Sequence, residues 1–308
     1  MIASSALADR LGLPAGARAV ILNADDFGMC HAANTAISDL LARDRIDSAT
    51  VMVPCAWSPE ALAFAAGQPA LDVGVHLVLT SEWRRYRWRP LTGGATLVDP
   101  DGFFPADVAT VERQASEADV AAEIAAQLQA ALDAGVDVTH LDNHMGSVYG
   151  LLTGRDFLRP VFALAARHGL PFRLPRHMEG ADADPRLQAK LTEAAAVADA
   201  FGVEIVDRLW THPFELGGEG TADEETYEQV RDGFLALLRA VPSGVTEIYL
   251  HPMTDGEELR AAVDFGAAKR DYERRLLDDP VVRQAMADEG LVRLGWRALR
   301  DLQRGEAR

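Results

Sequence analysis

The sequence predicts a single α/β domain folded as an irregular, TIM-barrel-like β/α barrel. About eight short apolar, β-branched runs recur along the chain, and longer segments of helical periodicity lie between them. This is the pattern of parallel strands joined by helices, and the number of runs favours a barrel. The 308 residues are 48% hydrophobic and 25% charged, so the chain can bury a substantial core. A doubly wound open sheet is the competing architecture.

The predicted strands are short runs rich in Val, Ile and Leu, at Arg18 to Asn23, Ser48 to Val53, Asp72 to Leu79, Asp137 to Asp142, Phe172 to Pro175, Glu204 to Arg208, Thr246 to His251 and Leu291 to Leu294. The predicted helices between them include Ala32 to Arg43, Glu117 to Asp133, Phe157 to His168, Leu187 to Phe201 and Glu224 to Ala240. No repeat, low-complexity tract or linker divides the chain. We therefore expect one domain over residues 18–304, preceded by an N-terminal extension over residues 1–17.

One long irregular segment, residues 81–116, interrupts this regularity. It begins with alternating aromatic and arginine residues and then contains several glycines. A connection of this length in a compact domain is typically a lid or a substrate-binding loop, and Trp83 is our candidate for contact with substrate. The alternative is a surface excursion with a solvated basic turn.

Composition excludes several classes of function. Lys and Arg total 30 and Asp and Glu total 47, so the formal net charge of −17 repels phosphate backbones and anionic lipid surfaces. Two cysteines, Cys30 and Cys55, form no paired motif, which argues against a disulfide framework or a cysteine-based zinc site. The first 20 residues lack the pattern of a signal peptide, and no run is long enough to span a membrane. We expect a cytoplasmic protein that binds neither nucleic acid nor membrane.

The first cluster of polar residues ends the first predicted strand, in AVILNADDFG. An apolar start leads directly into Asn23, Asp25 and Asp26. Two adjacent carboxylates repel each other, so a site that keeps both of them charged generally has a cation nearby. The alternative is an Asx turn or a helix N-cap.

Histidines end three further predicted strands. His76 lies within a run of valines and leucines in DVGVHLVL, where a hydrogen-bonded core histidine is the common alternative. In THLDNHMG, strand periodicity puts His140, Asp142 and His144 on one face. His251 ends the late run EIYLHP, where it could donate a proton or simply cap the strand.

All these clusters fall at the carboxyl ends of their strands, where β/α barrels build active sites. One aspartate and two histidines suit Zn²⁺ or another divalent ion with a coordination position open to water. Such an ion lowers the pKa of water to about 7 and polarises carbonyl groups. The second carboxylate of the pair and His251 would then serve as base and acid in amide or ester hydrolysis.

Taken together, NADDFG with the following His31 and Asn34, then GVHLVLT, THLDNH and the late LHP resemble the YdjC/ChbG carbohydrate deacetylases. These are metal-dependent enzymes that remove N-acetyl groups from sugars such as chitooligosaccharides. The motifs occur in order from Asn23 to Pro252, so the resemblance spans most of the chain. It implies an irregular β/α barrel, one divalent metal ion (Zn²⁺ or Mg²⁺ above all) and a small N-acetylated sugar as substrate.

The resemblance also implies roles for individual residues. Asp26, His76 and His144 look like the metal ligands of the family, Asp25 resembles the general base, and His251 resembles the acid that protonates the leaving amine.

Three further residues look like supports around these: Arg173 resembles a family arginine near the site, and His140 a residue behind the ligands. Asp142 would orient a ligand imidazole through its free N–H. The chain departs from the family where Gly146 replaces a frequent histidine and Cys30 a frequent serine, which affects the sugar pocket more than the metal ligands.

Two other functions remain open at this point. A metal-dependent sugar isomerase or aldolase could use the same ligands to polarise a carbonyl without hydrolysis, and a sugar-binding protein could keep the fold without the chemistry. The sequence also leaves open the acyl sugar and its chain length, the physiological metal and the oligomeric state, for which a homodimer is one option.

Overall fold

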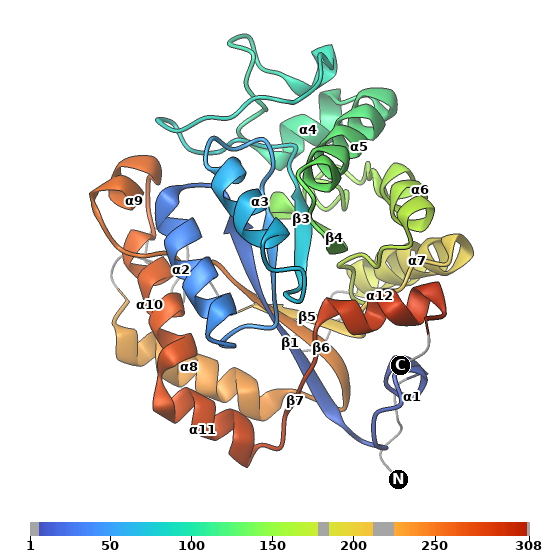
Figure 1. The fold of residues 1–308 in the computed structure, drawn as a ribbon. Helices are drawn as coiled ribbons and strands as arrows, with labels where there is room; N and C mark the ends of the chain where they lie inside the picture. The colour runs from blue at the N-terminus through green and yellow to red at the C-terminus, as the bar shows by residue number, and fades with distance from the viewer. Residues whose placement is uncertain (1–5, 178–184, 212–224, 307–308) are drawn as a thin grey trace.

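A parallel sheet forms the centre of the molecule in the computed structural model, which describes residues 6–177, 185–211 and 225–306 (Figure 1). Its strands are β1 (Arg18–Phe27), β2 (Ser48–Val51), β3 (Val73–Leu77), β4 (Val138–Asn143), β5 (Arg208–Thr211), β6 (Gly244–Leu250) and β7 (Val292–Arg293). The order across the sheet is β4-β3-β2-β1-β6-β5, and β7 pairs with the first residues of β1. Every pairing is parallel, as the alternation of strands and helices predicts.

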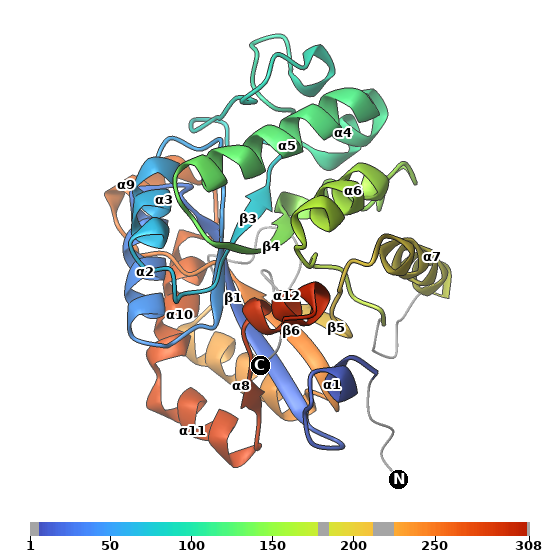
Figure 2. The same ribbon diagram turned by 45° about the vertical axis from the view of Figure 1, so that its right-hand side comes forward.

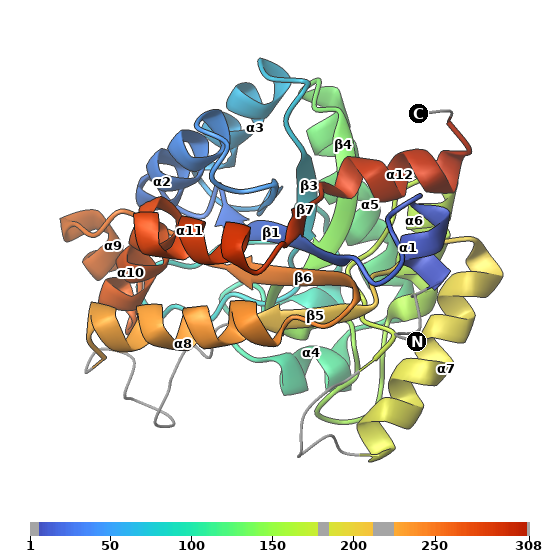
Figure 3. The same cartoon turned by 90° about the horizontal axis from the view of Figure 1, so that it is seen from below.

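Most of the helices surround this sheet on its outer side, and α1 and α12 lie at the amino ends of its strands (Figures 2 and 3). The α-helices are α1 (Ala6–Arg10), α2 (His31–Ala42), α3 (Ser58–Ala66), α4 (Val108–Gln114), α5 (Glu117–Asp133), α6 (Leu158–His168), α7 (Pro185–Phe201), α8 (Tyr227–Ala240), α9 (Glu257–Ala262), α10 (Ala267–Asp278), α11 (Pro280–Asp288) and α12 (Trp296–Arg304). Two 3₁₀ turns, η1 (Ala95–Leu97) and η2 (His144–Gly146), complete the described elements. None of these helices is long and apolar enough to cross a bilayer.

The sheet curves into a half-barrel, which is less than the irregular, TIM-barrel-like ring of about eight strands that the sequence predicts. The predicted strand Phe172 to Pro175 makes only single bridges, to Leu141 on one side and Val206 on the other. Pro171 and Pro175 have no N–H to donate, so this run cannot sustain a ladder. The predicted strand Glu204 to Arg208 also shifts, because continuous pairing with β6 starts only at Arg208.

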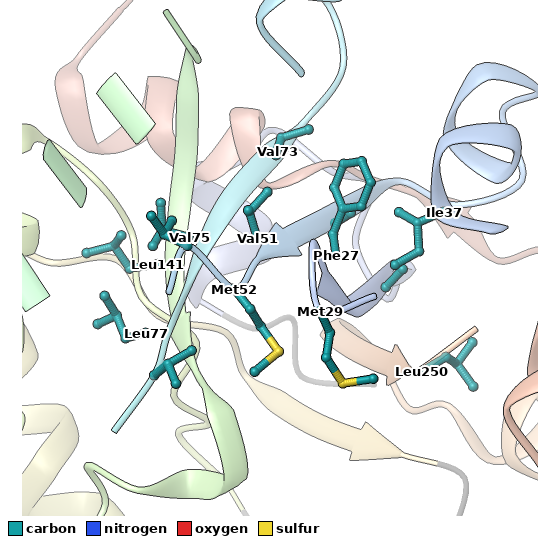
Figure 4. Packing of buried hydrophobic residues seen from close by; sticks show 14 of the residues in the cluster. Phe27, Met29, Ile37, Val51, Met52, Val73, Val75, Leu77, Leu141 and Leu250 are labelled. Atoms are coloured by element: carbon teal, nitrogen blue, oxygen red, sulfur yellow. The ribbon is translucent and has the colours of Figure 1, made fainter. Parts of the chain in front are cut away.

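Side chains alternate between the two faces of the curved sheet. One face of β1 to β4 joins the main hydrophobic cluster beneath the helices, with Val51, Val75 and Leu141 in it (Figure 4). The other face is apolar at the amino ends of the strands and polar at their carboxyl ends. At the amino ends, Ile21 and Trp296 belong to a second apolar cluster. Towards the carboxyl ends the same face carries the polar residues Asn23, Asp25, Thr50, His76, Asp142 and Glu247, all buried.

The structure contains helices beyond those named from the sequence. Residues 81–116 contain η1 and α4 rather than only irregular chain. Residues 1–17 contain α1, and its Leu7 packs in the second apolar cluster. The predicted helix Glu224 to Ala240 is α8, which begins at Tyr227 behind a capping box on Thr226; Glu224 lies outside the described residues.

Candidate metal centre and active site

A bulge at the end of β1 lets two neighbouring carboxylates point into the same site. In a regular strand, Asp25 and Asp26 would face opposite sides of the sheet. Here the register with β2 slips between Ala24 and Phe27, and Asp26 adopts a left-handed backbone conformation with φ of 66°. Aspartate is one of the few residues that tolerate this conformation, although it stores some strain. The bulge thus converts two adjacent residues into one pair of convergent acids.

Two histidines from neighbouring strands meet this pair. His76 in β3 directs Nε2 towards both acids, 3.7 Å from Asp26 Oδ1 and 3.9 Å from Asp25 Oδ2. His144, in the turn η2 directly after β4, has Nδ1 3.5 Å from Asp26 Oδ1. The two imidazole rings meet edge to face, with centroids 5.4 Å apart. All four residues are buried.

The outer nitrogen of each histidine is held by a carboxylate. His76 Nδ1 lies 2.7 Å from Asp142 Oδ1, and Asp142 Oδ2 in turn accepts a hydrogen bond from Thr50. His144 Nε2 lies 3.0 Å from Glu82 Oε2, at the start of the 81–116 segment. Each ring is therefore fixed in orientation, with its other nitrogen turned towards Asp26.

Arg173 forms ion pairs with three buried acids of the site. Its guanidinium makes a bidentate pair with Asp25, with both N–O distances 2.7 Å. It also contacts Asp142 at 2.9 Å and Glu247 at 2.8 Å. One cation thus serves three buried carboxylates, which holds the Asp25 carboxylate in a fixed plane.

Two groups of buried side chains could hold a metal ion, and the first of them fits a divalent ion better. Asp26, His76 and His144 offer three ligand atoms within 4.8 Å of one another. Asp26 Oδ1 is buried and accepts no hydrogen bond from the described residues, and its distances to the two nitrogens are close to the about 3.3 Å separating ligands of a tetrahedral zinc ion. Asp25, His76 and Asp142 also lie within 4.8 Å, but there the Arg173 guanidinium already balances the charge.

The electrostatics keep both acids ionised. Burial raises the pKa of the Asp25 carboxyl, but Arg173 and then His76 outweigh this effect and bring the pKa down to about 2. Burial likewise opposes ionisation of Asp26, and the adjacent His144 and the charge of His251 shift its pKa well below the usual range. For His144, burial favours the neutral ring, yet Glu82 and Asp26 raise its pKa to about 10.

His251 follows β6, the neighbour of β1 on the side away from β2. Its backbone N–H donates to Glu273 Oε2 at 2.6 Å, and its Nδ1 lies 3.9 Å from the same oxygen. The side chain is 23% exposed, whereas the Asp25 side chain is 3% exposed. The positive form of His251 lowers the pKa of both acids, so it lies within electrostatic reach of them.

Two other predicted residues lie apart from this cluster. The His140 ring stacks on Trp296 with centroids 4.7 Å apart, and burial shifts its pKa well below the usual value. Trp83 is buried, packs edge to face on Phe265 and lies beneath the Arg270 guanidinium. Among the described residues, neither side chain hydrogen-bonds to the acids or to the ligand histidines.

Sequence reasoning missed two carboxylates of the site. Glu247 had a visible signal, because it is a charged residue within the apolar strand β6. Glu82 had none, because it lies in an irregular segment and reaches His144 only through the fold. The local backbone accounts for a glycine at position 146. Met145 and Gly146 both have positive φ, so the chain turns sharply after His144.

Fold and site together define a class: a parallel α/β half-barrel with two acids and two histidines buried at the carboxyl edge of its sheet. The family model described as YdjC-like protein matches residues 19–288, and the chain belongs to this family.

Two named relatives match this chain over very different shares of their length. A carbohydrate deacetylase of Thermus thermophilus is 35% identical over 299 residues, covering 96% of this chain and 98% of that protein. A chitooligosaccharide deacetylase of Yersinia enterocolitica is 40% identical over a shorter stretch of 83 residues, 27% of this chain and 30% of that protein.

The fold also occurs among solved structures. A crystal structure from Enterococcus faecalis V583, of a protein provisionally described as a cellobiose-phosphate cleavage protein, superposes with a TM-score of 0.71. It covers 92% of this chain and 99% of that chain at 23% identity, so the likeness concerns the fold alone.

Proposed function

We propose that this chain is a metal-dependent carbohydrate deacetylase, a hydrolase that cleaves the N-acetyl amide bond of amino sugars or chitooligosaccharides. The observation that carries the proposal is the convergence of Asp26, His76 and His144 beside a second acid, Asp25, at the carboxyl edge of the sheet. The relative from Thermus thermophilus, which is similar over nearly its whole length and is named for this activity, supports the same reaction. We assign the activity to the domain over residues 18–304.

The proposed ligands are Asp26 Oδ1, His76 Nε2 and His144 Nδ1, the three atoms that face one another. This set of one oxygen and two nitrogens suits Zn²⁺ and is also compatible with Mg²⁺. A divalent ion held there would polarise the acetamido carbonyl and make the attacking water more acidic.

Asp25 is the proposed general base. Its pKa of about 2 keeps it at neutral pH in the ionised form, which is the form that can accept a proton. The bidentate pair with Arg173 fixes the direction in which it accepts that proton.

His251 is the proposed general acid. Its side chain is the more exposed of the proposed catalytic pair, which suits a group that meets the leaving nitrogen of an incoming sugar. The new bond joins the water oxygen to the carbonyl carbon, the carbon–nitrogen bond breaks, and the proton from His251 goes to the nitrogen. The products are acetate and a free amine.

Acetate release from a panel of N-acetylated mono- and oligosaccharides, with and without a chelator, tests the proposal. We expect acetate only with metal present. Asp25→Asn and His251→Ala should each lower the rate about 10²- to 10⁴-fold while the purified protein keeps its metal. His76→Ala and His144→Ala should instead lose the metal, as measured by elemental analysis.

The alternatives give different results in the same assay. An isomerase or aldolase would convert sugar without producing acetate, and a sugar-binding protein would bind the panel without turnover. Full activity of Asp25→Asn or His251→Ala would remove the acid–base assignment, and unchanged metal in both histidine variants would remove the ligand assignment.

A further inference from the structure

Resting on the proposed function, we propose that Glu82 is a positioning residue of the metal centre, which holds the His144 imidazole with Nδ1 directed at the ion. Nothing in the motifs that include Asp26, His76 and His144 points to it. Glu82 reaches the centre from the 81–116 segment, and its Oε2 lies 3.0 Å from His144 Nε2.

The hydrogen bond determines which ring nitrogen is available. A neutral imidazole has one N–H donor and one acceptor nitrogen, and a carboxylate accepts only from the donor. Once a bound metal ion replaces the second proton of the ring, Glu82 would keep the remaining proton on Nε2 and leave the lone pair on Nδ1, 3.5 Å from Asp26 Oδ1. Without Glu82, the ring could rotate or carry its proton on the nitrogen that faces Asp26.

His76, the other proposed histidine ligand, is held by a carboxylate in the same way, but through Nδ1 instead of Nε2. Asp142 holds His76 Nδ1 at 2.7 Å, so His76 faces Asp26 with Nε2. The proposed centre thus has one histidine bound through each kind of ring nitrogen. Carboxylate–histidine–metal relays of this sort fix the ring and increase the basicity of the ligand.

Contacts of the two residues that flank Glu82 hold this part of the 81–116 segment in place. On one side of Glu82, the Ser81 N–H donates to the Pro105 carbonyl, and Ser81 Oγ accepts from the Arg87 side chain and the Trp88 N–H. On the other side, the Trp83 side chain is buried. Trp88 itself packs edge to face on His144, with centroids 6.0 Å apart. The segment thus contacts the His144 ring at two points, through Glu82 and through Trp88.

Metal affinity is the direct test, because it does not depend on turnover. Competition with a chromophoric chelator for Zn²⁺ should show that Glu82→Ala raises the dissociation constant about 10- to 100-fold. Glu82→Gln, whose amide oxygen can still accept the Nε2 proton, should fall between Glu82→Ala and the wild type.

Asp99→Asn is the matched control. Asp99 lies in the same segment, is 22% exposed compared with 18% for Glu82, and pairs with Arg87, from which an asparagine oxygen at this position can still accept a hydrogen bond. It contacts none of the ligands, so we expect wild-type affinity. An unchanged dissociation constant in both Glu82 variants would overturn the proposal, as would an equal loss in Asp99→Asn.

A second readout needs no variant. Imidazole ¹⁵N NMR of the zinc-loaded wild type should show His144 bound through Nδ1 with a proton on Nε2, and His76 bound through Nε2 with a proton on Nδ1. Binding of His144 through Nε2 would overturn the role of Glu82 while leaving the deacetylase proposal standing. A wild-type protein that binds no divalent ion would instead remove the proposed function itself.

Discussion

Gly74 is the residue in β3 that makes room for the His140 ring, behind the candidate metal centre. A Cβ at this position would lie 2.6 Å from the Cε1 and Nδ1 atoms of His140 and 2.7 Å from its carbonyl oxygen. The His140 ring is in turn stacked on Trp296, so it cannot move aside. Glycine is required here for close packing rather than for an unusual backbone angle.

We therefore expect Gly74→Ala to lower the free energy of unfolding by about 1–3 kcal/mol, because the added methyl overpacks a rigid pair of rings. Urea unfolding measures the change. Gly93→Ala is the control, since nothing lies within 4 Å of a methyl group placed there, and it should change stability by less than about 0.5 kcal/mol. Equal effects of the two substitutions would contradict the packing argument.

Both cysteines are free and buried, close to the site but without a redox role in our proposal. Burial raises the pKa of the Cys30 thiol to about 12 and shifts that of Cys55 well above its usual value. Only the thiolate reacts, so both thiols should be inert to DTNB in the native protein at pH 8. In denaturant the reagent should titrate two thiols per chain. Fast reaction of a thiol in the native protein would show that this cysteine is accessible to the reagent.

At the scale of elements, helix α2 begins beside the candidate metal centre, and its N-cap residue, Cys30, forms no side-chain cap. Glu258 of α9 takes over this role, and its two oxygens accept the N–H groups of His31 and Ala32 at 2.9 and 2.8 Å. A carboxylate at a helix N-terminus also interacts favourably with the helix dipole. Helix α9 thus fixes the start of the helix that follows the two acids of the site.

Glu258→Ala should consequently destabilise the protein by about 0.5–2 kcal/mol, the usual cost of losing an N-cap. Glu257→Ala is the matched control, because Glu257 is also exposed, lies in the same first turn of α9 and accepts no hydrogen bond from α2. Thermal unfolding of the two variants gives the comparison. A loss of stability shared equally by both would mean that the charge of the turn matters and the bridge does not.

For the whole molecule, the main feature is a half-barrel interior that is apolar at one end and charged at the other. Arg173 lies among Asp25, Asp142 and Glu247, so one guanidinium faces three buried acids. Glu247 is the least well balanced: its Oε2 is buried and accepts no hydrogen bond from the described residues. Burial raises the pKa of Glu247, and Arg173 lowers it. Because the charges of Asp142 and Asp25 also raise this pKa, it reaches about 7.

This raised pKa predicts the sign of a pH effect on stability. In the unfolded chain Glu247 loses its proton near the ordinary value of 4.5, but in the fold it keeps the proton up to about pH 7. Its contribution to stability is therefore present in full below pH 4.5 and is lost as the pH rises through 7.

Glu247→Gln keeps the shape and removes the titration. The stability of the wild type relative to Glu247→Gln should fall between about pH 5 and pH 7, by at most about 1.4 kcal/mol per pH unit, and become constant above about pH 8. Urea unfolding at several pH values measures this difference. Parallel stability curves for the two proteins would show that Glu247 is ionised in the fold.

The sequence by itself predicted the class of fold and selected acids and histidines that the fold brings close together. Alternating apolar runs and helical segments indicated a parallel α/β sheet, because the periods of strands and helices are local properties of the chain. Asp25, Asp26, His76 and His144 could be selected as candidates because polar residues at the ends of apolar strands are conspicuous.

The tertiary structure decided what depends on distant contacts. It decided that a bulge turns both Asp25 and Asp26 inward, that the run from Phe172 to Pro175 makes bridges rather than a strand, and that Trp83 packs inside. It also brought Glu82 to His144, 62 residues further along the chain. The physical reason is that a hydrogen bond or ion pair depends on distances in space, and residues far apart in the sequence acquire those distances only when the whole chain has packed.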